Sequence, residues 1–186
     1  MAEIVQSKVT LEDFIREMHQ IPTRDLRLEH LKELFGRLDL SETLVNEHIN
    51  FASDTYSRNL ICRTPRFDML CLCWRPGQVT VIHDHAGSLN VTRVSQGELT
   101  ARIFKVHDRP LPGRALVKQE IEEHLGSADF STVDYGQIHQ LENTSNQDLI
   151  TVHVYAKPLK DIHRYCPNTG EVDRVTLRYS LEDEFA

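Results

Sequence analysis

Two histidines one residue apart, His83 and His85, are the residues whose types and spacing most directly indicate chemistry in this sequence. They follow Gly77-Gln-Val-Thr-Val-Ile82, an apolar run with a β-branched majority. Because side chains alternate between the faces of a strand, both imidazoles should share one face and Asp84 should turn to the other. Two neutral imidazoles side by side are half of a site for a divalent metal. The alternative is a pair of surface histidines on a half-exposed strand.

The composition fits one folded, soluble domain with a sizeable core. The chain has 186 residues, of which 40% are hydrophobic and 26% charged. A net charge of −7, without a long Lys/Arg block, argues against a nucleic-acid partner. No apolar run approaches the ~20 residues of a membrane span. The first residues show no basic patch leading into an apolar stretch, so we expect no signal peptide and a cytoplasmic location.

The four cysteines do not form a zinc-ribbon or thioredoxin-like motif, because none of them belongs to a C-x-x-C pair. Cys71 and Cys73 lie in Met69-Leu-Cys-Leu-Cys-Trp74, which is typical of a buried strand. We expect this pair to be small core residues in a reducing compartment. Metal ligation by the pair is the alternative.

The N-terminal part of the chain, about residues 10–50, predicts helices. Thr10-Leu-Glu-Asp13 has the form of a capping box, with Asp in place of Glu or Gln, at the start of an apolar pattern of helical period. A second helical pattern spans residues 26–38, and a third spans residues 44–49. We expect these helices to pack as a flank on a sheet.

From about residue 56 to residue 180 the sequence predicts an antiparallel sandwich or barrel. Short runs rich in Val, Ile, Thr, Phe and Tyr recur between turn signals such as Arg75-Pro-Gly77 and Gln96-Gly97. Residues 109–129 fit a long loop or a short strand around Leu116–Ile121. No linker is apparent, so residues 1–186 are expected to form a single domain. The expected strands are Phe67–Trp74, Gln78–Ile82, Leu89–Ser95, Leu99–Lys105, Gly136–Leu141, Leu149–Tyr155 and Val172–Tyr179.

The spacing around the two histidines extends into a longer pattern. It reads Gly77-x5-His83-x-His85-x4-Asn90-x6-Gly97, followed later by Gly136-x2-His139-x3-Asn143. These stretches resemble the two signature motifs of the cupin superfamily, which are small β-barrels with a metal in the barrel mouth. In that family the first motif supplies two His and usually a Glu, and the second supplies another His. Asn90 stands at the Glu position here, and Asp134 stands where the family often has Pro.

This departure changes the chemistry of the expected metal site. The resemblance implies three neutral ligands, His83, His85 and His139, without a carboxylate. A two-His, one-carboxylate face is the usual nonheme iron arrangement. A three-His face carries one negative charge fewer, so it can accept an anionic ligand such as a thiolate. His139 alone would otherwise be interpreted as a core histidine.

Several further motifs narrow the resemblance to the cysteine dioxygenase family, the thiol dioxygenases of the cupin fold. They cover about residues 10–180. In chain order they are Tyr56-Ser-Arg58-Asn-Leu60, Leu72-Cys-Trp74, Ile82-His-Asp-His85, His139-x-Leu-Glu-Asn143 and Val152-His-Val-Tyr155. The resemblance implies one Fe(II) per chain, with cysteine and O2 as substrates and cysteine sulfinic acid as product. The metal lowers the pKa of the thiol, and holding both reactants on one ion makes the step effectively unimolecular.

The same resemblance implies roles for residues beyond the ligands. Arg58 corresponds to the arginine that binds the substrate carboxylate, whose geometry a guanidinium matches with two hydrogen bonds. Tyr56 corresponds to a hydroxyl near that group. Thr151, His153 and Tyr155 alternate in one strand and match a hydrogen-bonded series that places the Tyr155 hydroxyl over the metal. Without the resemblance, an ordinary polar strand face and a surface arginine would be the interpretations.

One position departs from the animal enzymes of this family. They carry a Cys that crosslinks to the tyrosine corresponding to Tyr155, and Asn90 occupies its position here. We therefore expect an uncrosslinked Tyr155, as is general in bacterial members, and a bacterial origin. His163 and Arg164 fit either the site entrance or a solvated loop.

The sequence leaves two other functions open. Enzymes that act on 3-mercaptopropionate are similar but tend to carry Gln where Arg58 stands, which favours cysteine as the substrate. From another class, a cupin can bind a metal or small metabolite without oxidising it. A sensor would more naturally carry a fused DNA-binding or signalling domain, and none fits in 186 residues. For assembly we expect a monomer or a weak homo-oligomer, without a nucleic-acid or membrane partner.

Overall fold

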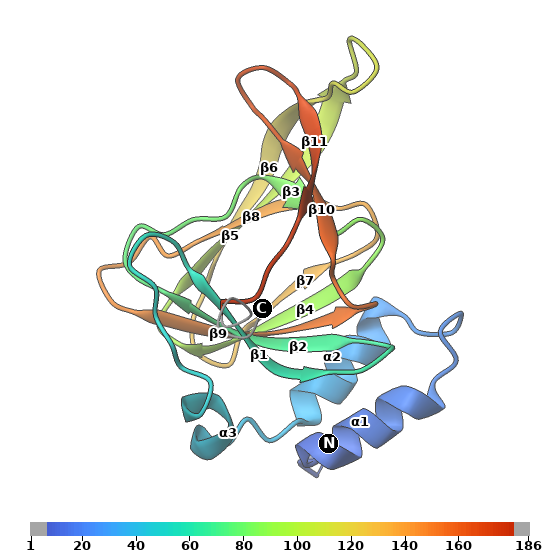
Figure 1. Ribbon diagram of the computed structural model, residues 1–186, viewed down its shortest axis with the longest axis vertical. Coiled ribbons are helices and arrows are strands. Elements are labelled where there is room, and N and C mark those ends of the chain that lie inside the picture. Colours follow the sequence, from blue (N-terminus) through green and yellow to red (C-terminus); the bar gives the residue numbers. More distant parts are fainter. Residues whose placement is uncertain (1–6, 181–186) are drawn as a thin grey trace, which may run out of the picture.

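A computed structural model of the chain describes residues 7–180 (Figure 1). The helices are α1 (Leu11–Gln20), α2 (Leu28–Arg37) and α3 (Glu42–Asn46). The strands are β1 (Ser57–Arg63), β2 (Asp68–Trp74), β3 (His83–Asp84), β4 (Leu89–Gln96), β5 (Leu99–Asp108), β6 (Leu116–Leu125), β7 (Phe130–Val133), β8 (Ile138–Glu142), β9 (Leu149–Ala156), β10 (Asp161–Tyr165) and β11 (Val172–Thr176).

Two antiparallel sheets face each other and form the barrel (Figure 1). The strand order is β1-β2-β9-β4-β7 in the five-stranded sheet and β11-β10-β3-β8-β5-β6 in the six-stranded sheet. The N-terminal helices cover the outer face of the five-stranded sheet. The prediction of a mainly β, cupin-like barrel with an N-terminal helical flank is therefore confirmed. Among the described residues, no helix is long and apolar enough to cross a membrane.

The first helix begins where the sequence indicates. The Thr10 hydroxyl caps it by accepting a hydrogen bond from the Asp13 amide at 3.1 Å. The Asp13 carboxylate accepts from the Thr10 hydroxyl at 2.9 Å, so it bonds the Thr10 side chain and not the Thr10 backbone amide as in a full capping box. The predicted third helix is displaced. It begins at Glu42, because the Ser41 hydroxyl accepts from the amide of Leu44, and it ends at Asn46.

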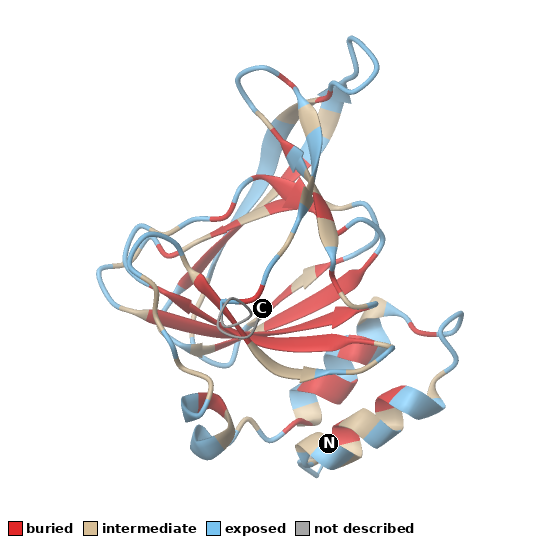
Figure 2. Ribbon diagram, in the orientation of Figure 1, coloured by how far each residue is buried: buried red, intermediate tan, exposed pale blue. Residues whose placement is uncertain are grey.

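The neighbouring strands β2 and β9 of the five-stranded sheet are buried on both faces, as their apolar sequences require (Figure 2). On β2, Met69, Cys71 and Cys73 pack in the cluster that contains the helices. Leu72 and Trp74 alternate with them and pack inside the barrel. The barrel interior is therefore lined by every second residue of β2 and β9, and polar residues at those positions face a closed space.

One strand prediction was wrong, and one stretch that the sequence left open proved to be a strand. Gln78–Ile82 makes only an isolated bridge at Val79, and the hydroxyl of Thr80, in place of a backbone group, accepts from the amide of Leu141. The ambiguous stretch around Leu116–Ile121 is strand β6, which pairs with β5 over its whole length. It is an exposed edge strand, so its sequence carries no apolar alternation.

Gly97 shows why the first motif ends in glycine. Its φ is +87°, a left-handed conformation that L side chains rarely adopt. A Cβ atom there would lie 2.7 Å from the carbonyl oxygen of Asp148. Gly97 therefore allows β4 to turn into β5 directly against the start of β9.

Candidate metal centre

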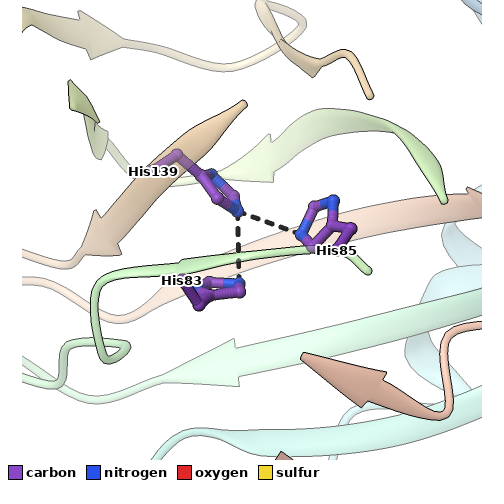
Figure 3. A group of neighbouring side chains, drawn as sticks. All are labelled: His83, His85 and His139. Carbon is purple, nitrogen blue, oxygen red and sulfur yellow. Dashed lines mark hydrogen bonds between the residues drawn. The ribbon is translucent and has the colours of Figure 1, made fainter. Parts of the chain in front are cut away.

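Three histidines converge inside the barrel (Figure 3). The Nε2 atom of His139 lies 3.0 Å from Nε2 of His85 and 3.2 Å from Nε2 of His83. His83 pairs directly with His139 across β3 and β8, and His85 directly follows the end of β3. Within residues 7–180, this group of possible metal ligands contains no carboxylate and no thiolate.

The electrostatics of the three rings suit a metal site. Burial, the largest effect, lowers the pKa of His83 to about 4 and lowers the pKa values of His85 and His139 well below the usual value. All three imidazoles are therefore neutral at pH 7. The Nδ1 atom of His83 lies 2.8 Å from the carbonyl oxygen of Val81, which can only accept, so the proton is on Nδ1 and the Nε2 lone pair points inward. Three neutral nitrogen atoms that converge on one position fit a divalent transition metal.

Asp84, which separates His83 from His85 in the sequence, turns away from the rings as predicted. Its carboxylate accepts from the Tyr165 hydroxyl at 2.9 Å and from the Ala86 amide at 2.8 Å, and it lies 3.0 Å from Nδ1 of His163. A two-residue strand has few backbone bonds of its own. The carboxylate therefore fastens β3 to β10. His163 and Arg164 lie on β10 and not in a loop.

A polar series runs along β9 toward the metal centre. Trp74 Nε1 donates to the Thr151 hydroxyl at 3.0 Å, and that hydroxyl lies 2.8 Å from Nε2 of His153. The Tyr155 hydroxyl lies 3.2 Å from Nδ1 of His153. The Tyr155 ring meets the His85 ring edge to face, with centroids 5.2 Å apart. All three β9 residues thus point into the barrel on the metal side.

Two residues of β4 complete this series, and sequence reasoning gave neither of them this role. Asn90 Nδ2 donates to the carbonyl of Val154 at 3.1 Å, which fixes the amide, and Oδ1 then accepts from the Thr92 hydroxyl at 3.1 Å. Thr92 has only one hydroxyl proton. Its 2.9 Å contact to His153 must therefore be a bond donated by Nδ1–H. The available signal was the i, i+2 spacing of two polar residues in an apolar strand.

The hydrogen bonds to Thr92 and Thr151 fix the tautomer of His153. The ring carries its proton on Nδ1, and Nε2 accepts from the Thr151 hydroxyl. Burial lowers the pKa of His153 to about 3, so the ring is neutral. The Tyr155 oxygen can share the Nδ1–H as an acceptor, which leaves its own proton available. Burial, the largest effect, raises the pKa of Tyr155 to about 12, so that proton is retained at pH 7.

Arg58 lies on β1 beside this series, with its guanidinium carbon 5.9 Å from the centre of the Tyr155 ring. Only 9% of Arg58 is exposed, and its Nε atom is buried without a hydrogen-bond partner among the described residues. Tyr56 stacks on Trp74 at a centroid distance of 4.3 Å. The pKa of the Tyr56 phenol is raised, because burial outweighs the opposite effect of Arg58, whose charge and hydrogen bond to Tyr56 lower this pKa. A buried cation with an unused donor is a binding site for an anion.

The structure thus brings together His83, His85, His139, Arg58, Tyr155, His153 and Thr151 around one interior space, with Tyr56 next to Arg58. Cys71 and Cys73 lie on the helical side of β2, outside this group. All four cysteines are free thiols, so no disulfide constrains the centre.

A two-sheet barrel with a group of possible metal-ligating histidines inside it defines the class of double-stranded β-helix, or cupin, proteins. Solved structures share this fold. A double-stranded β-helix protein from Klebsiella pneumoniae has a TM-score of 0.51 at 19% identity and covers 71% of this chain and 87% of its own. A protein from Thermus thermophilus has a TM-score of 0.52 at 17% identity and covers 65% of this chain and 99% of its own.

The chain belongs to the cysteine dioxygenase type I family, whose model matches residues 1–168. It is 27% identical to human cysteine dioxygenase type 1 over 174 residues, which is 91% of this chain and 86% of the human protein. The enzyme of the same name from Danio rerio is 25% identical over 178 residues, 94% of this chain and 88% of its own. The predicted family is therefore confirmed.

Proposed function

We propose that this protein is an Fe(II) dioxygenase that converts L-cysteine and O2 to cysteine sulfinic acid. The family membership supports this activity. The observation that carries the proposal is that the Tyr155 ring lies next to both the histidine group, through His85, and the buried Arg58. A small amino acid with a thiol at one end and a carboxylate at the other would span such a space.

The reaction balances without a further reductant. The thiol loses its proton, both oxygen atoms bond to sulfur, and sulfur gives up the four electrons that O2 accepts. Bound iron, held by His83, His85 and His139, would supply an electrophilic centre that lowers the pKa of the thiol and takes part in electron transfer to O2. Three neutral ligands leave the positive charge of the ion available for an anionic substrate sulfur.

Arg58 and Tyr56 bind the substrate carboxylate in this proposal. The support is the unpartnered, buried Nε atom of Arg58. A planar guanidinium offers two parallel donors to a carboxylate, and the exclusion of water strengthens the pairing. The Tyr56 hydroxyl, next to Arg58 and kept protonated by burial, adds a neutral donor.

Tyr155 donates a hydrogen bond to the reacting groups, and His153 and Thr151 position it. The hydroxyl accepts from the Nδ1–H of His153, so its own proton is directed elsewhere. Asn90 stands opposite Tyr155 in the β4–β9 register. We infer that Tyr155 is not crosslinked, because this neighbour has no sulfur.

We also infer a single domain over residues 1–186 that acts in the cytoplasm as a monomer or weak homo-oligomer, without a nucleic-acid or membrane partner. Four free cysteines support a reducing compartment. The net charge of −7 supports the absence of a nucleic-acid partner.

The test is oxygen uptake by protein loaded with Fe(II) without air, with cysteine and 3-mercaptopropionate compared at equal concentration and the sulfinate identified by mass. Faster turnover of cysteine is expected. In Arg58→Gln, loss of a charged hydrogen bond worth about 1.5–3 kcal/mol should raise KM for cysteine tenfold to a hundredfold. Arg16→Gln, an exposed arginine on α1, is the control.

Three other outcomes would revise the proposal. A preference for 3-mercaptopropionate would keep the chemistry and change the substrate. Unchanged cysteine kinetics in Arg58→Gln would remove Arg58 from the site. No oxygen uptake with either thiol, in protein that holds one iron per chain, would favour a cupin that binds a metabolite without oxidising it.

A further inference from the structure

Three cavities surround the connection between β9 and β10, residues 157–160. Their volumes are about 590, 240 and 150 Å3, and Lys160 lines all three. The 150 Å3 cavity reaches His85, and the 240 Å3 cavity reaches Arg58. The connection therefore lies between the outside of the molecule and both halves of the proposed site.

The two larger cavities share one sign of charge, and we call them together the basic basin. Five cationic side chains line them, and within residues 7–180 no carboxylate does. The cations are Arg58, Arg63, Lys157, Lys160 and Arg178. Since the whole chain carries a net charge of −7, this concentration of positive charge runs against its composition.

The outer cations of the basin differ from Arg63, which pairs with the buried Asp68 at 3.1 Å. Lys157, Lys160 and Arg178 are exposed, and their side chains make no hydrogen bond or ion pair with another described residue. The backbone of the two lysines is held, since the Leu177 amide donates to the Lys160 carbonyl at 2.9 Å and the Ser88 hydroxyl donates to the Lys157 carbonyl. The basin therefore presents unpaired positive charge at its rim, together with the unpartnered Nε of Arg58.

We propose that the basic basin is an access site for carboxylate thiols of net negative charge, and that it sets the preference between anionic and zwitterionic thiols. This inference rests on the proposed function. A cleft lined by one sign of charge raises the local concentration of oppositely charged ligands. 3-Mercaptopropionate has a net charge of −1 at pH 7, so the positive charge of the basin raises its local concentration. The opposite charges of zwitterionic cysteine largely cancel at a distance, so cysteine gains little.

The test compares kcat/KM for the two thiols at low and high salt in the iron-loaded enzyme. A unit charge about 10 Å away in water changes binding about twofold, so Lys157→Gln with Lys160→Gln should lower kcat/KM for 3-mercaptopropionate about fourfold at low salt. The value for cysteine should change less than twofold. Salt near 0.5 M should abolish the difference between variant and parent. Lys157→Arg with Lys160→Arg should behave as the parent does.

Lys118→Gln is the matched control, because Lys118 is an exposed lysine on β6 that lines none of the three cavities. The proposed role of the basic basin would be refuted by an equal loss of kcat/KM for both thiols, by a loss that persists at high salt, or by the same loss in Lys118→Gln. A second measurement does not depend on the proposed activity: 3-mercaptopropionate is titrated into metal-free protein, and its binding is monitored by the NMR shifts of residues 157–160. The same fourfold weakening is expected there, even if no oxygen is consumed.

Discussion

At the scale of single residues, local spacing predicted the groups that lie close in sequence or repeat on one strand. The His83–His85 pair and the alternation of Thr151, His153 and Tyr155 follow from strand geometry alone. The role of Thr92 could not be predicted in this way. It depends on the register that places Thr92 opposite His153 across β4 and β9, and register is a property of the folded sheet.

The tautomer of His153 gives a test of this register. Thr92→Val removes the acceptor of the Nδ1–H and keeps the shape of the side chain. No group then requires the proton on Nδ1, so the ring can carry it on Nε2, donate to the Thr151 oxygen and accept the Tyr155 proton at Nδ1. We expect kcat for cysteine to fall about tenfold, which corresponds to about 1.4 kcal/mol, with KM changed less than twofold.

Long-range proton–nitrogen NMR of metal-free protein supplies the second measurement, since it distinguishes the two neutral tautomers of His153. The parent and Thr92→Ser should show the proton on Nδ1, and Thr92→Ser should recover most of the activity. The tautomer assignment would be wrong if the parent carried the proton on Nε2. An inactive Thr92→Ser would show that Thr92 serves only packing.

At the scale of elements, the sequence predicted the strands with long apolar runs, such as β2 and β9, but not the partly buried strands β1, β7 and β10. It left β6 open between a long loop and a short strand, because an edge strand exposed on both faces needs no apolar residues. It also placed a strand at Gln78–Ile82, where a threonine hydroxyl replaces a ladder bond, and expected both His83 and His85 on one strand, whereas β3 ends at Asp84. The strand that carries His83 is only two residues long, so its position depends on the side chain between the ligands.

Asp84 is therefore expected to determine how tightly the metal binds, although it does not touch it. Asp84→Asn weakens the charge-assisted bonds to His163 and Tyr165 and loosens β3 from β10. We expect the affinity for a divalent metal, measured by competition with a chelator, to fall about tenfold. Asp173→Asn removes an exposed carboxylate that pairs with Arg164 on β10 and should leave the affinity unchanged. Equal affinities in both variants would mean that packing alone holds β3.

At the scale of the whole molecule, the barrel keeps four imidazoles in a space that favours their neutral form. The helices cover one sheet and the second sheet closes the other side, so water does not stabilise a charged ring there (Figure 2). His153 is completely buried and His83 is 8% exposed. The burial that prepares neutral ligands for a metal should therefore also make the metal-free fold sensitive to acid.

The sign of this sensitivity follows from linkage. Unfolded histidine takes up a proton near pH 6.5, whereas the folded pKa is about 4 for His83 and about 3 for His153. Between these values the unfolded state binds more protons, so stability is full above pH 6.5 and is lost as the pH falls toward 4. Each of the two residues should remove about 2 kcal/mol between pH 7 and pH 5. Urea unfolding of metal-free protein at both pH values measures the loss. In His153→Gln the loss should be about 2 kcal/mol smaller than in the parent, and an equal loss would mean that His153 is charged or accessible to water in the folded protein.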